Sequence, residues 1–126
     1  MEERRSYPRY PVWTNSLVVW RGSDERIPAV IWDLSEGGAA IEVTDMVPGR
    51  DIDVLLTAEG VAEFLPMRLI KSNPGTIRGV LLHARFCDLS PENRGLLVRA
   101  LSVWRQLHEE RQAWLASRAN DLRRTG

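Results

Sequence analysis

The sequence predicts a mainly β protein in which six antiparallel strands form a barrel or sandwich and one long C-terminal α-helix follows. From Pro11 to Phe86, short stretches rich in Val and Ile alternate with Gly, Pro, Asn and Asp at intervals of about ten residues, as in chains of strands and tight turns. After Ser90 the spacing becomes that of an amphipathic helix. The connections leave no room for the crossover helices of a parallel sheet.

Each expected strand ends at residues that favour turns. Turns are predicted at 21–24, 47–50, 59–60 and 73–75, where Gly, Pro, Asn or Asp occur. The strands between them are predicted at residues 12–20, 27–34, 39–43, 51–56, 61–72 and 77–86.

The helix has a clear start. Ser90 is a suitable N-cap, Pro91 suits the first helical position, and Glu92 complements the positive end of the helix dipole. A wide apolar stripe follows, formed by Leu96, Leu97, Ala100, Leu101, Val103, Trp104, Leu107 and Trp114. We expect the first half of the helix to cover one end of the barrel, and the second half to project beyond it or to meet another subunit.

A chain of 126 residues fits one domain. We divide it into an arginine-rich arm at 1–10, the barrel at 11–89 and the helix at 90–123. A composition with 44% hydrophobic and 27% charged residues is typical of a soluble globular protein. Seventeen basic residues balance seventeen acidic ones, which argues against general nucleic-acid binding.

Cysteine content and hydropathy bear on location. Cys87 is the only cysteine, so an internal disulfide is excluded and a reducing, cytoplasmic location is expected. The N-terminus lacks an apolar region of the secretory type, and no stretch has the length of a membrane span. We therefore expect neither export nor membrane insertion.

Two arginines four residues apart, Arg5 and Arg9, precede the first strand. Pro8 disfavours helix for Tyr7, so the segment should be extended, with both guanidinium groups able to reach one ligand. Alone, an Arg-x-x-x-Arg pattern is more often a solvated basic tail than a ligand-binding arm.

A second polar motif, Asp33-Leu34-Ser35-Glu36-Gly37-Gly38, lies where the second strand ends and the third begins. The paired glycines are expected to allow positive φ and close approach of a ligand, while Asp33 accepts hydrogen bonds and Ser35 accepts or donates them. Alone, such a motif is more commonly a loop whose side chains satisfy only local backbone groups.

Together, Arg-x-x-x-Arg before the first strand and Asp-x-Ser-x-x-Gly between the second and third resemble the PilZ family. Residues 79–86, followed by Asp88-Leu89-Ser90-Pro91, are similar to the last strand and helix start of that family. The resemblance covers residues 4–104 and implies a six-stranded antiparallel PilZ-type β-barrel that binds the bacterial second messenger cyclic di-GMP.

The resemblance also implies roles for individual residues. Arg5 and Arg9 would contact the guanines and phosphates, Asp33 and Ser35 would hydrogen-bond guanine by side chain or backbone, and Gly38 would hold the turn open. Arg4 would either favour an intercalated ligand dimer or simply offset Glu2 and Glu3.

Catalysis and metal binding find no support in the sequence. His83, in an apolar strand, His108 and Cys87 match no zinc spacing, and neither a nucleophile elbow nor a phosphate-binding loop occurs. His83 is expected in the barrel wall. We expect core or barrel-end packing to explain most of the five tryptophans, with Trp32 close enough to the ligand to report on it.

The function implied is a switch without catalysis: arm and turn close on cyclic di-GMP, and an effector protein recognises the new surface. A homo-oligomer through the C-terminal helix is a further expectation. The alternatives are a PilZ-like adaptor that binds no nucleotide and a small enzyme acting on cyclic dinucleotides.

Overall fold

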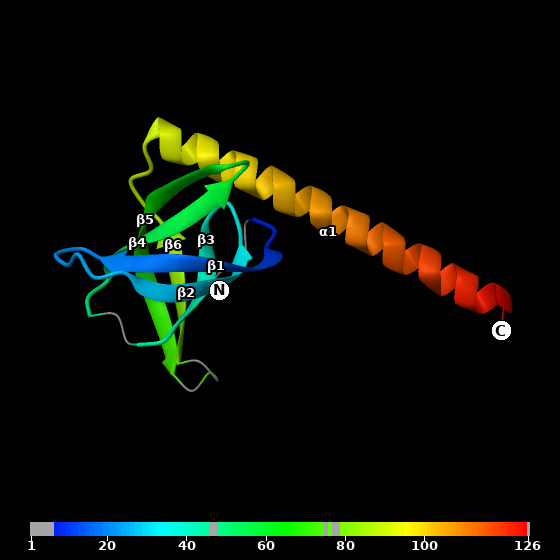
Figure 1. Cartoon of the computed structure of the whole chain (residues 1–126), viewed down its shortest axis with the longest axis horizontal. Coiled ribbons are helices and arrows are strands. Elements are labelled where there is room, and N and C mark those ends of the chain that lie inside the picture. Colours follow the sequence, from blue (N-terminus) through cyan, green and yellow to red (C-terminus); the bar gives the residue numbers. More distant parts are fainter. Residues whose placement is uncertain (1–6, 46–47, 75, 77–78, 126) are drawn as a thin grey trace, which may run out of the picture.

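The computed structural model describes residues 7–45, 48–74, 76 and 79–125. Six antiparallel strands close into a barrel in the order β1-β2-β3-β6-β5-β4, and a long helix leaves one side of it (Figure 1). The elements are β1 (Tyr10–Trp20), β2 (Ile27–Leu34), β3 (Gly38–Val43), β4 (Asp51–Ala58), β5 (Val61–Pro74), β6 (Val80–Phe86) and α1 (Pro91–Thr125). The predicted fold class is confirmed, and of the two sheet arrangements the barrel is correct because β1 also pairs with β4.

One predicted turn is wrong within the described residues. Asn73 and Pro74 continue β5 and lie opposite Leu81 and Val80 of β6, where a turn was expected. The Asn73 amide is held 3.2 Å from Nε2 of His83, and Pro74 is tolerated because it ends the strand. Residues 77 and 78, predicted as the start of the last strand, lie outside the described residues, as do residues 47 and 75 of two predicted turns.

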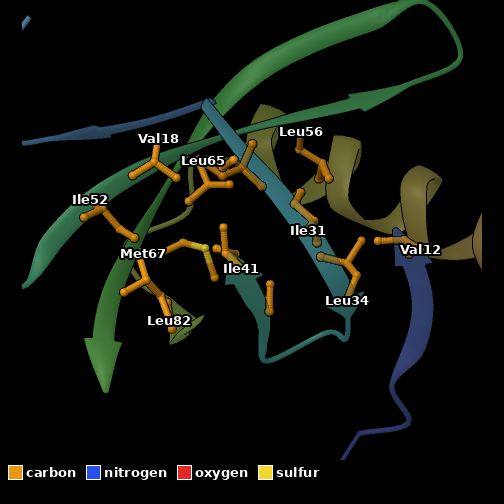
Figure 2. Packing of buried hydrophobic residues seen from close by; sticks show 14 of the residues in the cluster. Val12, Val18, Ile31, Leu34, Ile41, Ile52, Leu56, Leu65, Met67 and Leu82 are labelled. Atoms are coloured by element: carbon orange, nitrogen blue, oxygen red, sulfur yellow. The ribbon is translucent and has the colours of Figure 1, made fainter. Parts of the chain in front are cut away.

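The barrel interior fixes the register of the strands. In β3, Ala39, Ile41 and Val43 belong to the buried core, while Ala40 projects to the opposite face of the sheet. A slip by one residue would turn this apolar set outward, so burial specifies the pairing of β2 with β3. Figure 2 shows core side chains meeting inside the barrel; the largest fully buried ones from the strands are Ile31, Leu34, Ile41, Ile52, Leu65, Met67 and Leu82.

The helix begins as predicted. The Ser90 hydroxyl accepts a hydrogen bond from the Asn93 amide at 3.0 Å, which caps the first turn. Leu96, Leu97 and Ala100 are buried in the barrel core, and α1 packs against β1, β4 and β5. The first half therefore covers the barrel as expected.

The second half of α1 extends away from the barrel (Figure 1). All residues from 109 to 123 are exposed. None of the helices among the described residues combines the length and apolar character needed to cross a membrane.

The expectation for the tryptophans is correct only in part. Trp20 and Trp104 pack against the core, but Trp13 and Trp114 are 63% and 59% exposed. Trp13 is displaced because β1 is irregular between Pro11 and Thr14, and Trp114 because it lies beyond the barrel on α1.

Candidate ligand-binding site

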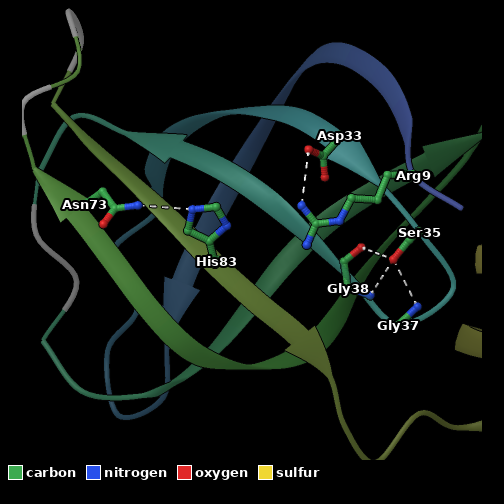
Figure 3. A network of polar contacts seen from close by, with 7 residues as sticks. All are labelled: Arg9, Asp33, Ser35, Gly37, Gly38, Asn73 and His83. Atoms are coloured by element: carbon green, nitrogen blue, oxygen red, sulfur yellow. Dashed lines mark hydrogen bonds and ion pairs between the residues drawn. The ribbon is translucent and has the colours of Figure 1, made fainter. Parts of the chain in front are cut away.

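Ser35 organises the turn between β2 and β3. Its hydroxyl oxygen accepts hydrogen bonds from the amides of Gly37 at 3.2 Å and Gly38 at 3.1 Å, and donates to the Gly38 carbonyl at 3.3 Å. A serine hydroxyl has one proton and two lone pairs, so its capacity is used within the turn (Figure 3). Ser35 is 7% exposed, which makes it a buried structural element of the motif.

The glycines serve the turn differently from the expectation. Neither Gly37 nor Gly38 is among the described residues with positive φ, so the turn does not use the left-handed conformation that glycine allows. A Cβ on Gly38 would overlap the Ala84 carbonyl and lie 3.0 Å from the Arg85 Cα, because β6 crosses closely there. Gly38 thus permits close packing of β3 on β6. A Cβ on Gly37 would lie 3.1 Å from the ring of Tyr7, which covers the turn.

Asp33 lies at an irregularity of the β2–β3 ladder, where the register shifts after Ile31. The shift leaves Asp33 opposite Ala40, with Arg9 reaching toward it from the segment before β1 (Figure 3). Arg9 Nη1 is 3.8 Å from Asp33 Oδ2, and the two side chains are 33% and 27% exposed. Within the described part of the chain, the buried Asp33 Oδ1 has no hydrogen-bond partner.

Trp32, beside Asp33, also carries an unsatisfied group. Its buried indole Nε1 finds no hydrogen-bond acceptor among the residues described. The ring of Trp13 lies against it with centroids 5.0 Å apart. Trp13 has a φ of 45°, a conformation that residues with side chains rarely adopt, and it occupies the irregular part of β1.

The structure thus brings together Arg9, Asp33, Ser35 and Gly38 of the predicted site, whereas Arg4 and Arg5 lie outside the described residues. The Trp13–Trp32 pair was not predicted, because it depends on two strand irregularities that leave no trace in the residue pattern. His83 lies in β6 of the barrel wall as expected. Across the described ranges, no three His, Cys, Asp or Glu side chains are grouped to hold a metal ion.

A closed six-stranded barrel with an arginine facing a serine-locked Asp-x-Ser-x-x-Gly turn defines the architecture of a PilZ domain. The sequence profile of the PilZ domain family matches residues 3–102, and the chain belongs to this family.

Solved structures share the fold at low sequence identity. The first is YcgR in complex with c-di-GMP from Escherichia coli, at TM-score 0.67 and 20% identity over 90% of this chain and 51% of that one. The second, the PilZ domain of YcgR with c-di-GMP, gives TM-score 0.64 and 21% identity over 87% and 98% of the two chains. The third is the Bacillus subtilis inhibitor of motility MotI/DgrA, at TM-score 0.62 and 16% identity over 85% and 53%.

The chain therefore spans about half the length of YcgR and of MotI. No curated protein matches it in sequence.

Proposed function

We propose that this protein is a receptor for cyclic di-GMP, with the ligand bound between the arginine arm and the Asp33 turn. One observation carries the proposal: Asp33 presents one carboxylate oxygen to Arg9 while, among the described residues, the other is buried without a hydrogen-bond partner. Such an unsatisfied buried acceptor costs free energy unless a ligand or water completes it. The PilZ domain of YcgR, which shares the fold, has been solved with c-di-GMP.

Guanine suits this acceptor. Its N1–H and N2–H₂ groups form a planar pair of donors, the same kind of fork that the Arg9 guanidinium presents to a carboxylate. The proposed step is an exchange: the guanine edge takes the place of Arg9 at Asp33, and Arg9 turns to the phosphates or the guanine face. At 3.8 Å the existing ion pair is longer than a hydrogen bond, so opening it costs little free energy.

The other motif residues have distinct proposed roles. Arg5 joins Arg9 on the ligand, and Arg4 allows a second molecule to bind as an intercalated dimer. Ser35 acts by holding the turn, since its hydroxyl is saturated by Gly37 and Gly38. Gly38 keeps the turn seated against β6.

The proposed output is a change of surface without chemistry. Closure of the arm over the turn creates a surface that an effector protein recognises in the bacterial cytoplasm. The location is proposed from the family's second-messenger role and from the single cysteine, Cys87. An adaptor that binds no nucleotide is the rival.

Calorimetric titration tests the proposal. The native protein should bind cyclic di-GMP with micromolar or tighter affinity and strongly prefer it to cyclic di-AMP, because adenine lacks the paired donors that Asp33 accepts. Asp33→Ala should abolish this preference, while Asp24→Ala, in the exposed β1–β2 turn, should not. Equal affinity for the two dinucleotides would remove the guanine-recognition role, and absence of binding would favour the adaptor.

A further inference from the structure

The exposed second half of α1 carries a row of residues whose types are arranged symmetrically about its midpoint. The stripe consists of Leu107, Arg111, Trp114, Leu115, Arg118 and Leu122, which we call the distal stripe. Successive members are four, three, one, three and four residues apart, and the order of residue types is Leu, Arg, apolar, apolar, Arg, Leu. The pattern is symmetric about the midpoint between Trp114 and Leu115.

The distal stripe continues the face of α1 that the barrel buries. Leu107 and Trp114 lie seven and fourteen residues after buried Ala100, and Arg111 and Arg118 lie likewise after Trp104. Such spacings keep residues on one face of a helix. Beyond the barrel the apolar members of this face are open, with Leu107 48%, Trp114 59%, Leu115 45% and Leu122 65% exposed.

We propose that the distal stripe binds the same stripe of a second copy, in an antiparallel helix pair whose two-fold axis passes between Trp114 and Leu115. A two-fold interface must be self-complementary, and the mirror order places the apolar members of the distal stripe opposite one another across the axis. In that pairing Leu107 lies opposite Leu122 of the second copy, and Trp114 lies opposite its Leu115.

The charges complement one another in the same pairing. Arg111 would lie opposite Arg118 of the second copy, an unfavourable pair on its own. Glu110 and Asp121 lie on one edge of the helix, because eleven residues make about three turns. The pairing brings Glu110 of one copy and Asp121 of the other within about one turn of the two arginines, so the charges at each end cancel. Arg118 already lies over the Trp114 ring, at 5.5 Å.

The barrel surface next to the stripe accommodates the second copy. A hollow beside Leu107 is lined by Pro11, Trp104, Leu107, His108 and Arg111. In the antiparallel pairing it receives Leu122 of the second copy. A parallel pairing is disfavoured, because each barrel packs on the stripe side of its own α1 at Leu97 and Ala100, and both barrels would need the same space.

Light scattering on the full chain tests the pairing. The native protein should have twice the mass of one chain. Leu115→Glu should weaken the dimer at least about tenfold, because each copy would place one buried carboxylate in the interface next to the two-fold axis. Ala113→Glu, the same change on the opposite face of the helix, should leave the mass unchanged. A native mass of one chain, or equal loss with both variants, would overturn the proposal.

Cross-linking tests the direction of the pairing. In a Cys87→Ser background, a bifunctional maleimide should join Leu107→Cys to Leu122→Cys in a mixture, but should not join either variant to itself. Self-linking of Leu107→Cys alone would show a parallel pair and contradict the inference. Unchanged thermal unfolding of the barrel in Leu115→Glu would show that the fold is intact. Unchanged nucleotide titration would show that the loss of the dimer is independent of ligand binding.

Discussion

Arg9 and Asp33 face each other across the start of the barrel, with Nη1 and Oδ2 3.8 Å apart and neither side chain fully buried. Their separation exceeds a hydrogen bond, and exposed ion pairs contribute about 0–1 kcal/mol. The contact therefore positions the arm beside the turn without locking it there. Under the proposed function, this is the contact that the ligand replaces.

Arg9→Ala should lower cyclic di-GMP affinity by about tenfold or more, because a charge-assisted contact to the ligand is lost. The free energy of unfolding should change by less than about 1 kcal/mol. Arg68→Ala is the matched control, since Arg68 makes a comparable surface pair with Asp51 at 3.2 Å. It should have the same small stability effect and leave titration unchanged; equal affinity in both variants would remove Arg9 from the site.

Ser35→Ala should lower both stability and affinity. The amides of Gly37 and Gly38 would lose their acceptor in a buried turn, at a cost of about 1–3 kcal/mol in the free energy of unfolding. Ser16→Ala provides the control, because Ser16 is equally buried at 7% exposure and its hydroxyl donates to the Leu55 carbonyl at 2.6 Å. Denaturation and titration should show destabilisation in both, but loss of affinity in Ser35→Ala alone.

Gly38→Ala should destabilise the barrel, because its Cβ would overlap the backbone of β6 at Ala84. We expect a loss of about 1–3 kcal/mol in chemical denaturation. Gly95→Ala makes the same change in α1, where the nearest atom is the Arg99 side chain at 3.9 Å. It should raise stability by about 0.5–1 kcal/mol, and a neutral Gly38→Ala would show that β3 and β6 can separate freely.

Trp32→Phe should reduce cyclic di-GMP affinity about tenfold, because the indole N–H, which has no acceptor among the described residues, would donate to the ligand. Stability without ligand should fall little, because removing an unsatisfied donor offsets the smaller ring. Trp20→Phe, in a tryptophan packed against the core, should leave affinity unchanged. Titration and thermal unfolding distinguish these outcomes, and unchanged affinity in Trp32→Phe would exclude the indole as a contact.

Much of the fold is specified by local residue patterns and could be predicted from the sequence. Val and Ile stretches separated by Gly and Pro specify six strands, and Ser90 with Pro91 specifies the start of α1 at the residue observed. The turn expected at Asn73 failed because long-range contacts outweigh turn preference: Asn73 pairs with Leu81 and holds His83. Residue preferences for strand conformation span only about 1 kcal/mol and depend on such cross-strand neighbours, so pairing decides the outcome.

By itself, the sequence determined the class of fold, the motif residues Arg9, Asp33, Ser35 and Gly38, and the capped helix. Only the tertiary structure decided that the Ser35 hydroxyl makes its hydrogen bonds within the turn, that Gly38 allows close packing on β6, and that Trp13 packs on Trp32. The physical reason is that the strands and the helix cap of the first set depend on neighbours within a few residues, and its motif residues stand out by their joint resemblance to the PilZ family. The second depends on how strands far apart in the chain meet, on register shifts in β1 and β2, and on where closure of the barrel brings β6 against the turn.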